Sequence, residues 1–474
     1  MRIDTRLHVA GVAHEGGPML PVHAPWDGEL IANVVMADAA HAEKAVVACV
    51  LAFERTRAMS SHERRELLRR IAVGITSLRG ELAELISREA GKPRSLAEAE
   101  VSRAISTFEL GAEEATRMGG EVMALDITAL SAGCTGEWIR VPAGPVIALS
   151  PFNFPLNLVA HKIAPALACG CSVVLKPPPQ APLTSLVLAQ IIRDAGAPPD
   201  AVQVVPCDVA VAEALVRDDR FATLSFTGSA KVGWHLKAIA GKKRVLLELG
   251  GNAAAIVHDD APPRAAQAVA ASAFGYAGQV CIKTQRLYLQ NTIADRFLAE
   301  LVERARAITP RDPLEPDCLL GPMIDEANAR RVEEWINDAR AKGARVLLGG
   351  TRTGTRFLPT ILAIDGDGRG LKVVDEEAFG PVLTVHRYDT WDDALRMADG
   401  TRYGLQAGIF TDSHARIRAA IDRLHVGGLV IGDTATFRVD SMPYGGTRDS
   451  GLGREGVRFA IEEMTERKML VFRN

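Results

Sequence analysis

The stretch Val245-Leu246-Leu247-Glu248-Leu249-Gly250-Gly251-Asn252 decides the fold class of this chain. An apolar run that suits a buried strand ends there in a carboxylate and a glycine pair, and a second apolar run follows at 254–257. Toward the N-terminus, further apolar runs alternate with segments of helical spacing: strands at 146–149, 172–175, 202–205 and 223–226, and helices at 186–192 and 209–216. This alternation predicts βαβ units, which build a parallel sheet with helices on its faces.

A second series of apolar runs follows at 286–289, 345–348, 382–385 and 429–431, so we expect two α/β modules in succession. Before the first module, residues 60–89 are predicted to form one long helix. Ser60 and Glu63 have capping-box spacing, an apolar stripe runs from Leu67 to Leu85, and Gly91-Lys92-Pro93 ends the helix. Two segments, 135–141 and 468–472, resemble exposed strands that pair with each other or with another subunit.

Composition narrows the class of protein. The 474 residues are 47% hydrophobic and 24% charged with a net charge of −3, which suits two or three globular domains without a general attraction to nucleic acid or membranes. The N-terminus does not resemble a signal peptide, and no apolar run approaches the ~18 residues of a transmembrane helix. The seven cysteines are few and odd in number, so we expect a reducing compartment, the cytoplasm.

Cys281 lies in Gly278-Gln279-Val280-Cys281, directly after a run of small residues. A cysteine in a loop bounded by glycine is accessible, as a nucleophile that must form a thiolate has to be. The alternative is a buried structural cysteine, and this motif alone does not decide between them.

Glu248 ends the apolar strand of the opening stretch. A carboxylate in that place is costly to bury in its ionised form unless it is paired or functional, and a raised pKa would suit a general base. The alternative is a carboxylate that only points outward from a strand end.

Asn153 follows the predicted strand 146–149 within Ser150-Pro151-Phe152-Asn153-Phe154-Pro155. The two prolines restrict the backbone around one amide, whose NH₂ group could be directed at a developing oxyanion. The alternative is an asparagine that caps a turn.

The glycine-rich elements do not include a G-x-G-x-x-G fingerprint after any strand. Gly228 and Ser229 instead form a turn after the predicted strand 223–226, where a helix N-terminus could receive a pyrophosphate. Cys169-Gly170-Cys171 is a C-x-C, and no second pair has ligand spacing, so we expect no metal site.

Taken together, these segments resemble the aldehyde dehydrogenase superfamily over essentially the whole chain. Seven motifs occur in the family's order: Pro151-Phe152-Asn153-Phe154-Pro155, Lys176-Pro177, Phe226-Thr227-Gly228-Ser229 through Gly233, Leu247-Glu248-Leu249-Gly250-Gly251, Gly278-Gln279-Val280-Cys281, Glu377-Ala378-Phe379-Gly380-Pro381 and Pro443-Tyr444-Gly445-Gly446. The resemblance implies an NAD(P)-binding domain of Rossmann-like α/β type (1–125 and 145–250), a catalytic α/β domain (251–445) and a small β oligomerisation domain (126–144 and 460–474) that forms a homodimer or homotetramer.

The resemblance also implies roles for single residues. Cys281 attacks the aldehyde, Asn153 and the Cys281 N–H hold the oxyanion, and Glu248 activates the water that hydrolyses the thioester. The cofactor is NAD or NADP, and the residues implied to bind it are Ser150, Pro151, Phe152, Lys176, Pro179, Gly228, Ser229, Leu249, Gly250, Glu377 and Phe379.

Two departures from the family pattern bear on specificity. NAD-preferring members usually have Glu three residues after the lysine, where this chain has Pro179, so we expect NADP to be accepted. The chain most resembles the branch of phosphonoacetaldehyde, lactaldehyde and non-phosphorylating glyceraldehyde-3-phosphate dehydrogenases, which implies a small anionic or hydroxylated aldehyde. The residues implied to bind it are Arg103, Phe154, His161, Val280, Ile282 and Arg438, although Val280 replaces the arginine typical of phosphorylated substrates. A surface ion pair is the alternative for each arginine.

Three alternatives remain open at this point. A coenzyme A-acylating relative would pass the acyl group from Cys281 to a thiol, but such members commonly lack the base that Glu248 provides. Succinic semialdehyde is an alternative substrate. A non-catalytic role on this fold is the third possibility, and the intact Cys281, Glu248 and Asn153 argue against it.

Overall fold

The computed structural model describes residues 3–473 and contains two large sheets. The first sheet has six strands, of which only the edge strand β23 is antiparallel to its neighbour. Its strands in spatial order are β23 (Gly451–Leu452), β11 (Arg244–Glu248), β10 (Thr223–Thr227), β7 (Val146–Leu149), β8 (Val173–Lys176) and β9 (Val202–Val204). The strand order reverses between β7 and β10, and ligands bind at such switch points, beyond the carboxyl ends of the strands.

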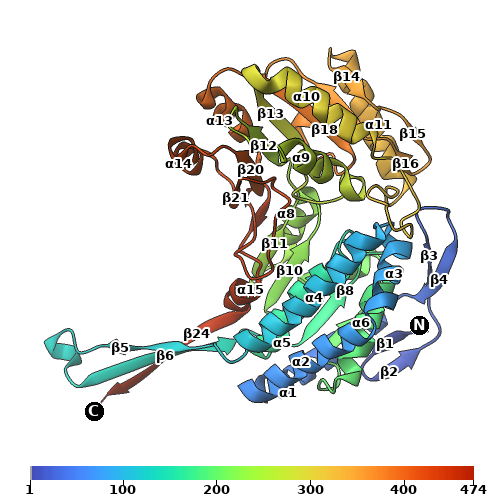
Figure 1. Cartoon of the computed structure of the whole chain (residues 1–474). Coiled ribbons are helices and arrows are strands. Elements are labelled where there is room, and N and C mark those ends of the chain that lie inside the picture. Colours follow the sequence, from blue (N-terminus) through green and yellow to red (C-terminus); the bar gives the residue numbers. More distant parts are fainter. Residues whose placement is uncertain (1–2, 474) are drawn as a thin grey trace.

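The second sheet has seven strands and is parallel except for the edge strand β14. Its order is β14 (Arg345–Leu348), β17 (Thr360–Ala363), β18 (Val382–Tyr388), β13 (Arg286–Gln290), β12 (Ala254–Val257), β20 (Gln406–Phe410) and β21 (Gly428–Ile431). The two sheets lie in separate bodies of the molecule (Figure 1). Both predicted α/β modules are therefore present, each with its parallel sheet.

The central strands are buried on both faces. In β7, Val146 and Ala148 join one hydrophobic cluster, whereas Ile147 and Leu149 join the cluster on the opposite face. This explains why the strand is an uninterrupted apolar run rather than an alternating one.

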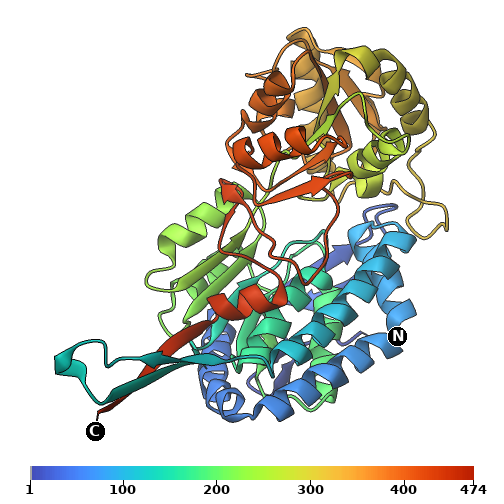
Figure 2. The same ribbon diagram turned by 60° about the vertical axis from the view of Figure 1, so that its left-hand side comes forward.

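A three-stranded antiparallel sheet, in the order β24 (Thr465–Arg473), β6 (Cys134–Pro142) and β5 (Gly120–Ala124), extends away from both bodies (Figures 1 and 2). Lys468 faces Ile139 and Phe472 faces Thr135 in the pairing of β24 with β6. The expectation that the two isolated segments pair with each other is thus confirmed.

Helices cover both large sheets. They are α1 (Ala39–Ala58), α2 (Ser61–Ser77), α3 (Arg79–Ala90), α4 (Arg94–Glu114), α5 (Asn157–Cys169), α6 (Leu183–Asp194), α7 (Val209–Arg217), α8 (Ala230–Ile239), α9 (Ala265–Phe274), α10 (Asn291–Arg306), α11 (Glu326–Ala341), α12 (Lys372–Asp375), α13 (Trp391–Asp399), α14 (His414–Arg423) and α15 (Val457–Glu463). Short two-stranded pairs complete the fold: β1 (Leu7–Val9) with β2 (Val12–His14), β3 (Met19–His23) with β4 (Leu30–Val35), β15 (Arg352–Thr353) with β16 (Arg356–Phe357), and β19 (Tyr403–Gly404) with β22 (Thr447–Arg448).

The single helix predicted over residues 60–89 is wrong, because the structure has two helices, α2 and α3, that meet at Leu78. The capping box of Ser60 and Glu63 is present, and the left-handed Gly91 ends α3. Near the break, the Ser77 hydroxyl donates to the Gly74 carbonyl, and such local side-chain bonds compete with the helical ladder. The apolar stripe continues across the break because both helices pack on the same hydrophobic cluster.

Candidate active site

A pocket of about 360 Å³ lies at the switch point of the first sheet. Its walls come from the segments that follow β7, β10 and β11, and from segments that precede β13 and β18 of the second sheet. The lining residues are Pro151, Phe152, Asn153, Leu158, Thr227, Gly228, Ser229, Glu248, Leu249, Gly250, Cys281, Asn328, Arg331, Glu377 and Phe379. All three predicted catalytic residues and eight of the eleven predicted cofactor residues therefore line one pocket.

The loop before Cys281 has an unusual backbone. Tyr276, Ala277 and Gly278 have consecutive positive φ angles of 53°, 52° and 65°. At Gly278 a Cβ atom would collide with the carbonyl oxygen of Gly380. Each of the two non-glycine residues costs about 1–3 kcal/mol, and strain of this kind is typical of functional loops.

Hydrogen bonds on both sides hold this strained loop. The Tyr276 hydroxyl donates to the Ala90 carbonyl at 3.0 Å. The Gln279 amide donates to the carbonyls of Tyr276 and Pro322, and its oxygen accepts from the Ile324 N–H. The loop thus presents Cys281 from a fixed backbone.

Cys281 is half-buried, and its sulfur lies 3.1 Å from the hydroxyl oxygen of Tyr444. Burial raises the pKa of the Cys281 thiol to about 11, although the Tyr444 hydrogen bond and the Arg438 charge oppose this. Val280, half-buried, and Ile282, buried, stand on either side of Cys281 in a small apolar cluster with Leu405 and Tyr444.

Asn153 is buried beside this loop, and its Nδ2 donates a hydrogen bond of 3.0 Å to the Gln279 carbonyl. One of the two amide hydrogens thereby fixes the side chain, and the other is available to a ligand in the pocket. The asparagine is therefore bonded to the nucleophile loop, which a simple turn cap would not require.

Glu248 is 3% exposed, and neither carboxylate oxygen has a hydrogen-bond partner within residues 3–473. Burial, and then the nearby charge of Glu455, raises the pKa of Glu248 well above its usual value. Such an orphaned carboxyl at the wall of a pocket has the properties of a general base that takes a proton from water.

A buried charge network lies behind Glu248. The Lys162 ammonium is 3.4 Å from one oxygen of Glu455, and the Arg438 guanidinium is 3.1 Å from the other. Burial opposes the ionisation of Glu455, but the charges of Lys162, His161 and Arg438 outweigh it and lower its pKa to about 2.

The cofactor side of the pocket contains a second buried carboxyl, Glu377, which accepts a hydrogen bond of 3.2 Å from the Gly251 N–H. Burial raises the pKa of Glu377 to about 7. A Cβ at Gly250 would collide with the Glu377 carboxylate, so this approach requires glycine. Opposite, the rings of Phe152 and Phe379 meet edge to face with their centroids 5.9 Å apart.

Ser150, Lys176 and Pro179 lie outside the lining of this pocket. Ser150 is buried directly after β7, Lys176 ends β8, and Pro179 is exposed beyond it. Ser229, which does line the pocket, caps α8, since its hydroxyl accepts a hydrogen bond from the Val232 N–H at 3.4 Å.

The basic residues expected to bind a substrate anion come together around an internal carboxylate, Asp440. Arg103 donates to Asp440 from Nε at 3.0 Å and from Nη2 at 2.6 Å, and His161 Nε2 lies 2.8 Å from it. Burial opposes the ionisation of Asp440, but the bonds from His161 and Arg103 outweigh it and lower its pKa. Arg438 approaches His161 Nε2 at 3.4 Å. The Phe154 ring faces two cations. Its centroid lies 3.5 Å from the Lys92 nitrogen and 5.8 Å from the Arg103 guanidinium carbon.

Sequence reasoning missed four residues that line the pocket: Leu158, Thr227, Asn328 and Arg331. Asn328 and Arg331 lie one turn apart on α11, far along the chain from every motif. Arg331 donates to the Ala378 carbonyl at 2.9 Å, which directs it toward the Glu377 segment. A polar pair at helical spacing is common on any surface helix, so the sequence carried no usable signal for them.

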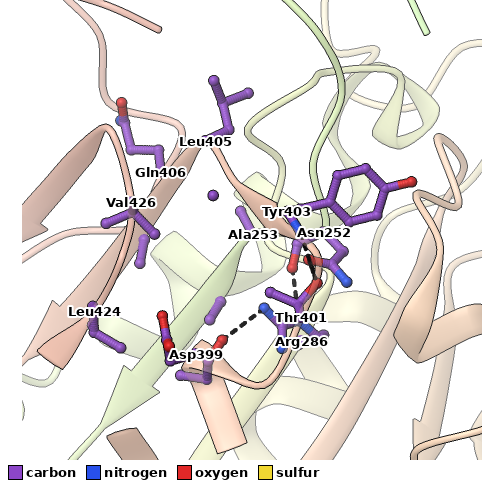
Figure 3. A pocket seen from close by; sticks show the side chains of 14 residues that line it. Asn252, Ala253, Arg286, Asp399, Thr401, Tyr403, Leu405, Gln406, Leu424 and Val426 are labelled. Atoms are coloured by element: carbon purple, nitrogen blue, oxygen red, sulfur yellow. Dashed lines mark hydrogen bonds between the residues drawn. The ribbon is translucent and has the colours of Figure 1, made fainter. Parts of the chain in front are cut away.

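A second hollow, of about 10 Å³, lies beside the segment that connects the two sheets and is no larger than one water molecule needs (Figure 3). Arg286 Nε donates to the Asn252 carbonyl at 2.8 Å, and the Thr401 hydroxyl donates to the Asn252 side-chain oxygen at 3.1 Å. Asn252 Nδ2 in turn donates to the Val374 carbonyl at 2.7 Å. These bonds anchor the connection between Glu248 and the second sheet.

The fold and the pocket define an α/β enzyme with a dinucleotide-type crevice and a cysteine, a carboxyl group and an amide at its wall. More particularly, residues 12–470 match the aldehyde dehydrogenase family, and the chain belongs to that family. It is an oxidoreductase that acts on aldehydes.

Three similar proteins place the chain within the family. The 3-sulfolactaldehyde dehydrogenase of Priestia aryabhattai is 40% identical over 467 residues, which cover 98% of this chain and 97% of that protein. The structure of aldehyde dehydrogenase 21 from Physcomitrella patens, in complex with the reaction product succinate, has 39% identity and a TM-score of 0.96, covering 99% and 98%. The glyceraldehyde-3-phosphate dehydrogenase GapN from Methanocaldococcus jannaschii, complexed with NADP, has 35% identity and a TM-score of 0.93, covering 97% and 100%.

These comparisons confirm the α/β fold class, the family and the branch that the motifs indicated. Among the helices of residues 3–473, none combines the length and apolar composition that crossing a bilayer requires.

Proposed function

We propose that this chain oxidises a small anionic or hydroxylated aldehyde to its carboxylic acid, with Cys281 as nucleophile, Glu248 as general base, and NAD or NADP as hydride acceptor. One observation carries the proposal: Cys281, Glu248 and Asn153 line the same pocket as Glu377 and Phe379, at the switch point of a parallel sheet. A volume of about 360 Å³ is within the usual range of about 300–1,000 Å³ for ligand sites.

The residues present fit a nicotinamide dinucleotide. Gly228 and Gly250 line the pocket with backbone that no side chain covers. The N-terminus of α8 faces the same space, and helix N-termini bind the phosphate groups of a pyrophosphate. Glu377, Phe379 and Phe152 would hold the nicotinamide riboside, with Ser150, Pro151 and Leu249 near it. Ser229 would hold the pyrophosphate, and Lys176 the adenosine ribose. When bound, the cofactor supplies the hydride acceptor.

The chain's own residues perform the remaining chemistry. The Cys281 thiolate attacks the aldehyde carbon, and the Asn153 amide with the Cys281 N–H stabilises the oxyanion of the hemithioacetal. One such donor is typically worth about 10²–10³ in rate. After oxidation to the thioester, Glu248 removes a proton from water, and the resulting hydroxide releases the acid and restores the Cys281 thiol.

The proposed anion-binding residues are Arg103, His161 and Arg438, which stand outside the lining of the pocket and contact Asp440 and Glu455. Within residues 3–473, Asp440 takes the Nε and Nη2 hydrogens of Arg103, which leaves Nη1 for a second anion. Val280, Ile282 and Phe154 supply the apolar contacts of a short carbon chain. The named substrate of the Priestia relative bears both a sulfonate and a hydroxyl, and succinate in the Physcomitrella structure is a dianion.

Replacing Arg103 with glutamine should raise KM for anionic aldehydes about tenfold, because one charge-assisted hydrogen bond is lost. The KM for neutral lactaldehyde should change less than about twofold, because this substrate has no charge for Arg103 to bind. The tenfold change expected for anions corresponds to about 1.4 kcal/mol. Steady-state kinetics with sulfolactaldehyde and lactaldehyde measure both values. Arg94→Gln, on the same helix α4 and paired with Glu98, is the matched control. An equal change for both substrates would contradict the role in anion binding.

Replacing Pro179 with glutamate should reduce kcat/KM for NADP at least about tenfold while kcat/KM for NAD is retained, because the new carboxylate repels the 2′-phosphate. Pro179 is exposed, so the fold should tolerate the change. Pro179→Gln is the control, because it removes the proline ring without adding a negative charge. If NADP were used equally well by Pro179→Glu, the cofactor phosphate would have to bind elsewhere.

A panel of aldehydes run with both cofactors tests the proposed function as a whole. We expect the acid as product and a preference for short anionic or hydroxylated substrates over long neutral ones. Formation of acyl-CoA in the presence of coenzyme A would favour the acylating alternative, and a clear preference for succinic semialdehyde would identify that alternative substrate.

The assignment of the sheets to functions is part of this proposal. The first sheet with 1–125 and 145–250 would bind the cofactor, 251–445 would form the catalytic domain, and 126–144 with 460–474 would mediate a homodimer or homotetramer. Strand β5, which precedes the third unit in the chain, pairs with β6 inside that unit. The edge strand β24, with half-exposed and exposed side chains over most of its length, supports assembly.

All seven cysteines are free, which supports a cytoplasmic location.

A further inference from the structure

Tyr444 is the only side chain within residues 3–473 whose polar atom hydrogen-bonds the Cys281 sulfur, at 3.1 Å. It lies on the loop after β21, is 3% exposed, and packs against Ile282 and Leu405. Burial raises the pKa of Tyr444 well above 10, so the phenol keeps its proton at neutral pH. A phenol that is always protonated can donate to a thiolate, whereas a thiolate can only accept.

Arg438 acts on the same ring. Its guanidinium carbon lies 3.7 Å from the Tyr444 ring centroid, and its Nη2 is bonded to Glu455. A cation over the ring face holds the ring in place and withdraws electron density from the phenol, which strengthens the O–H as a donor.

The other charged groups near the sulfur work against a thiolate. Glu248 at the end of β11 and Glu377 after α12 both raise the pKa of Cys281, and Arg438 lowers it. Because burial raises the pKa of Cys281 to about 11, the thiol form predominates at pH 7, and a donor to the sulfur favours the thiolate. A hydrogen bond to a charged acceptor changes an ionisation equilibrium by roughly tenfold to a hundredfold.

We propose that Tyr444 is a further catalytic residue, whose hydroxyl donates a hydrogen bond to the Cys281 sulfur and stabilises the thiolate that attacks the aldehyde, with Arg438 as its positioning residue. The inference rests on the proposed role of Cys281. The thiol proton passes to water, Tyr444 keeps its own proton, and the sulfur electron pair forms the bond to the carbonyl carbon.

Tyr444→Phe tests the proposal, because it removes one oxygen and leaves the packing. The measurement is the rate of iodoacetamide alkylation at Cys281 as a function of pH, read by mass spectrometry of the peptide that contains it. We expect the apparent thiol pKa to rise by about one unit, and both alkylation and kcat/KM at pH 7 to fall about tenfold. The deficit should shrink as pH rises, which a merely structural defect would not produce.

Tyr388→Phe is the matched control, since Tyr388 is equally buried and its hydroxyl donates to the Val257 carbonyl at 3.1 Å, outside the pocket. Replacement of Tyr444 by 3,5-difluorotyrosine is a second test, because the more acidic phenol is a stronger donor and should shift the thiol pKa downward. It also keeps the proposal testable if Tyr444→Phe does not fold.

An unchanged alkylation profile in Tyr444→Phe would overturn the inference, as would a fall in kcat at every pH without a shift of the thiol pKa. A different result would contradict the proposed function itself. In that case the wild-type enzyme would carry no acyl group on Cys281 during turnover, independently of the result for Tyr444→Phe.

Discussion

Replacing Cys281 with alanine is expected to reduce aldehyde oxidation by at least about 10⁴-fold, because removal of a covalent nucleophile leaves only binding and oxyanion stabilisation. Cofactor binding should remain within about twofold of wild type, since the change removes one sulfur atom and leaves Gly228, Ser229 and Glu377 at the pocket wall unaltered. NADPH formation measures the first quantity, and quenching of protein fluorescence on titration with NADP measures the second.

The control for Cys281→Ala is Cys318→Ala, which removes a buried thiol outside the pocket. A companion experiment quenches wild-type enzyme during turnover and locates the acyl group by mass spectrometry. Acyl mass on a residue other than Cys281, or an active Cys281→Ala enzyme, would refute the proposed nucleophile.

Much of this fold follows from local patterns in the sequence. The predicted strand at 254–257 coincides with β12, and the runs at 146–149 and 223–226 match β7 and β10 to within a residue. Strands buried on both faces are uninterrupted apolar runs, which are easy to recognise between turns. The prediction of one helix over 60–89 was wrong because an apolar stripe reports only which residues pack on the core. Here two helices that meet at Leu78 pack on the same cluster, so the stripe shows no break.

The motifs that carry the family resemblance also named most of the residues that line the pocket. The segments after β7, β10 and β11 meet there because the carboxyl ends of parallel strands share one edge of a sheet. Three features could not be read from the sequence. The left-handed backbone of Tyr276 and Ala277 is imposed by contacts with distant residues. The pairing of Arg103 with Asp440, and the approach of Tyr444 to Cys281, join segments separated by 337 and 163 residues. Long-range contacts of this kind leave no local pattern.

The environment of Glu248 predicts how the enzyme should depend on pH. Burial and the charge of Glu455 raise its pKa, so at low pH the carboxyl is protonated and cannot accept a proton from water. Deacylation should therefore accelerate as pH rises through this raised pKa, once the carboxylate becomes populated. Single-turnover measurements of acid release between about pH 5 and 9 would record this rise.

Replacing Glu248 with glutamine should abolish that rise and slow steady-state turnover by about 10²–10⁴-fold, the usual contribution of a general base. The amide has nearly the same shape as the carboxyl group and brings no charge into this buried place, so the fold should persist. Hydride transfer precedes hydrolysis, so the variant should still form about one equivalent of NADPH in a fast first phase, followed by a slow phase while the thioester on Cys281 persists.

Hydroxylamine discriminates between a lost base and a disturbed site, because this nucleophile cleaves a thioester without help from Glu248. It is added after the fast phase, once excess aldehyde has been removed, because it would otherwise condense with the aldehyde. It should release the acyl group of Glu248→Gln as a hydroxamate and restore the free Cys281 thiol. Normal steady-state turnover in Glu248→Gln would exclude Glu248 as the base. Absence of the fast phase would instead show that the variant loses activity at a step before the thioester forms. The Glu248 carboxyl would then serve to bind or orient the aldehyde, and another group would have to activate the water.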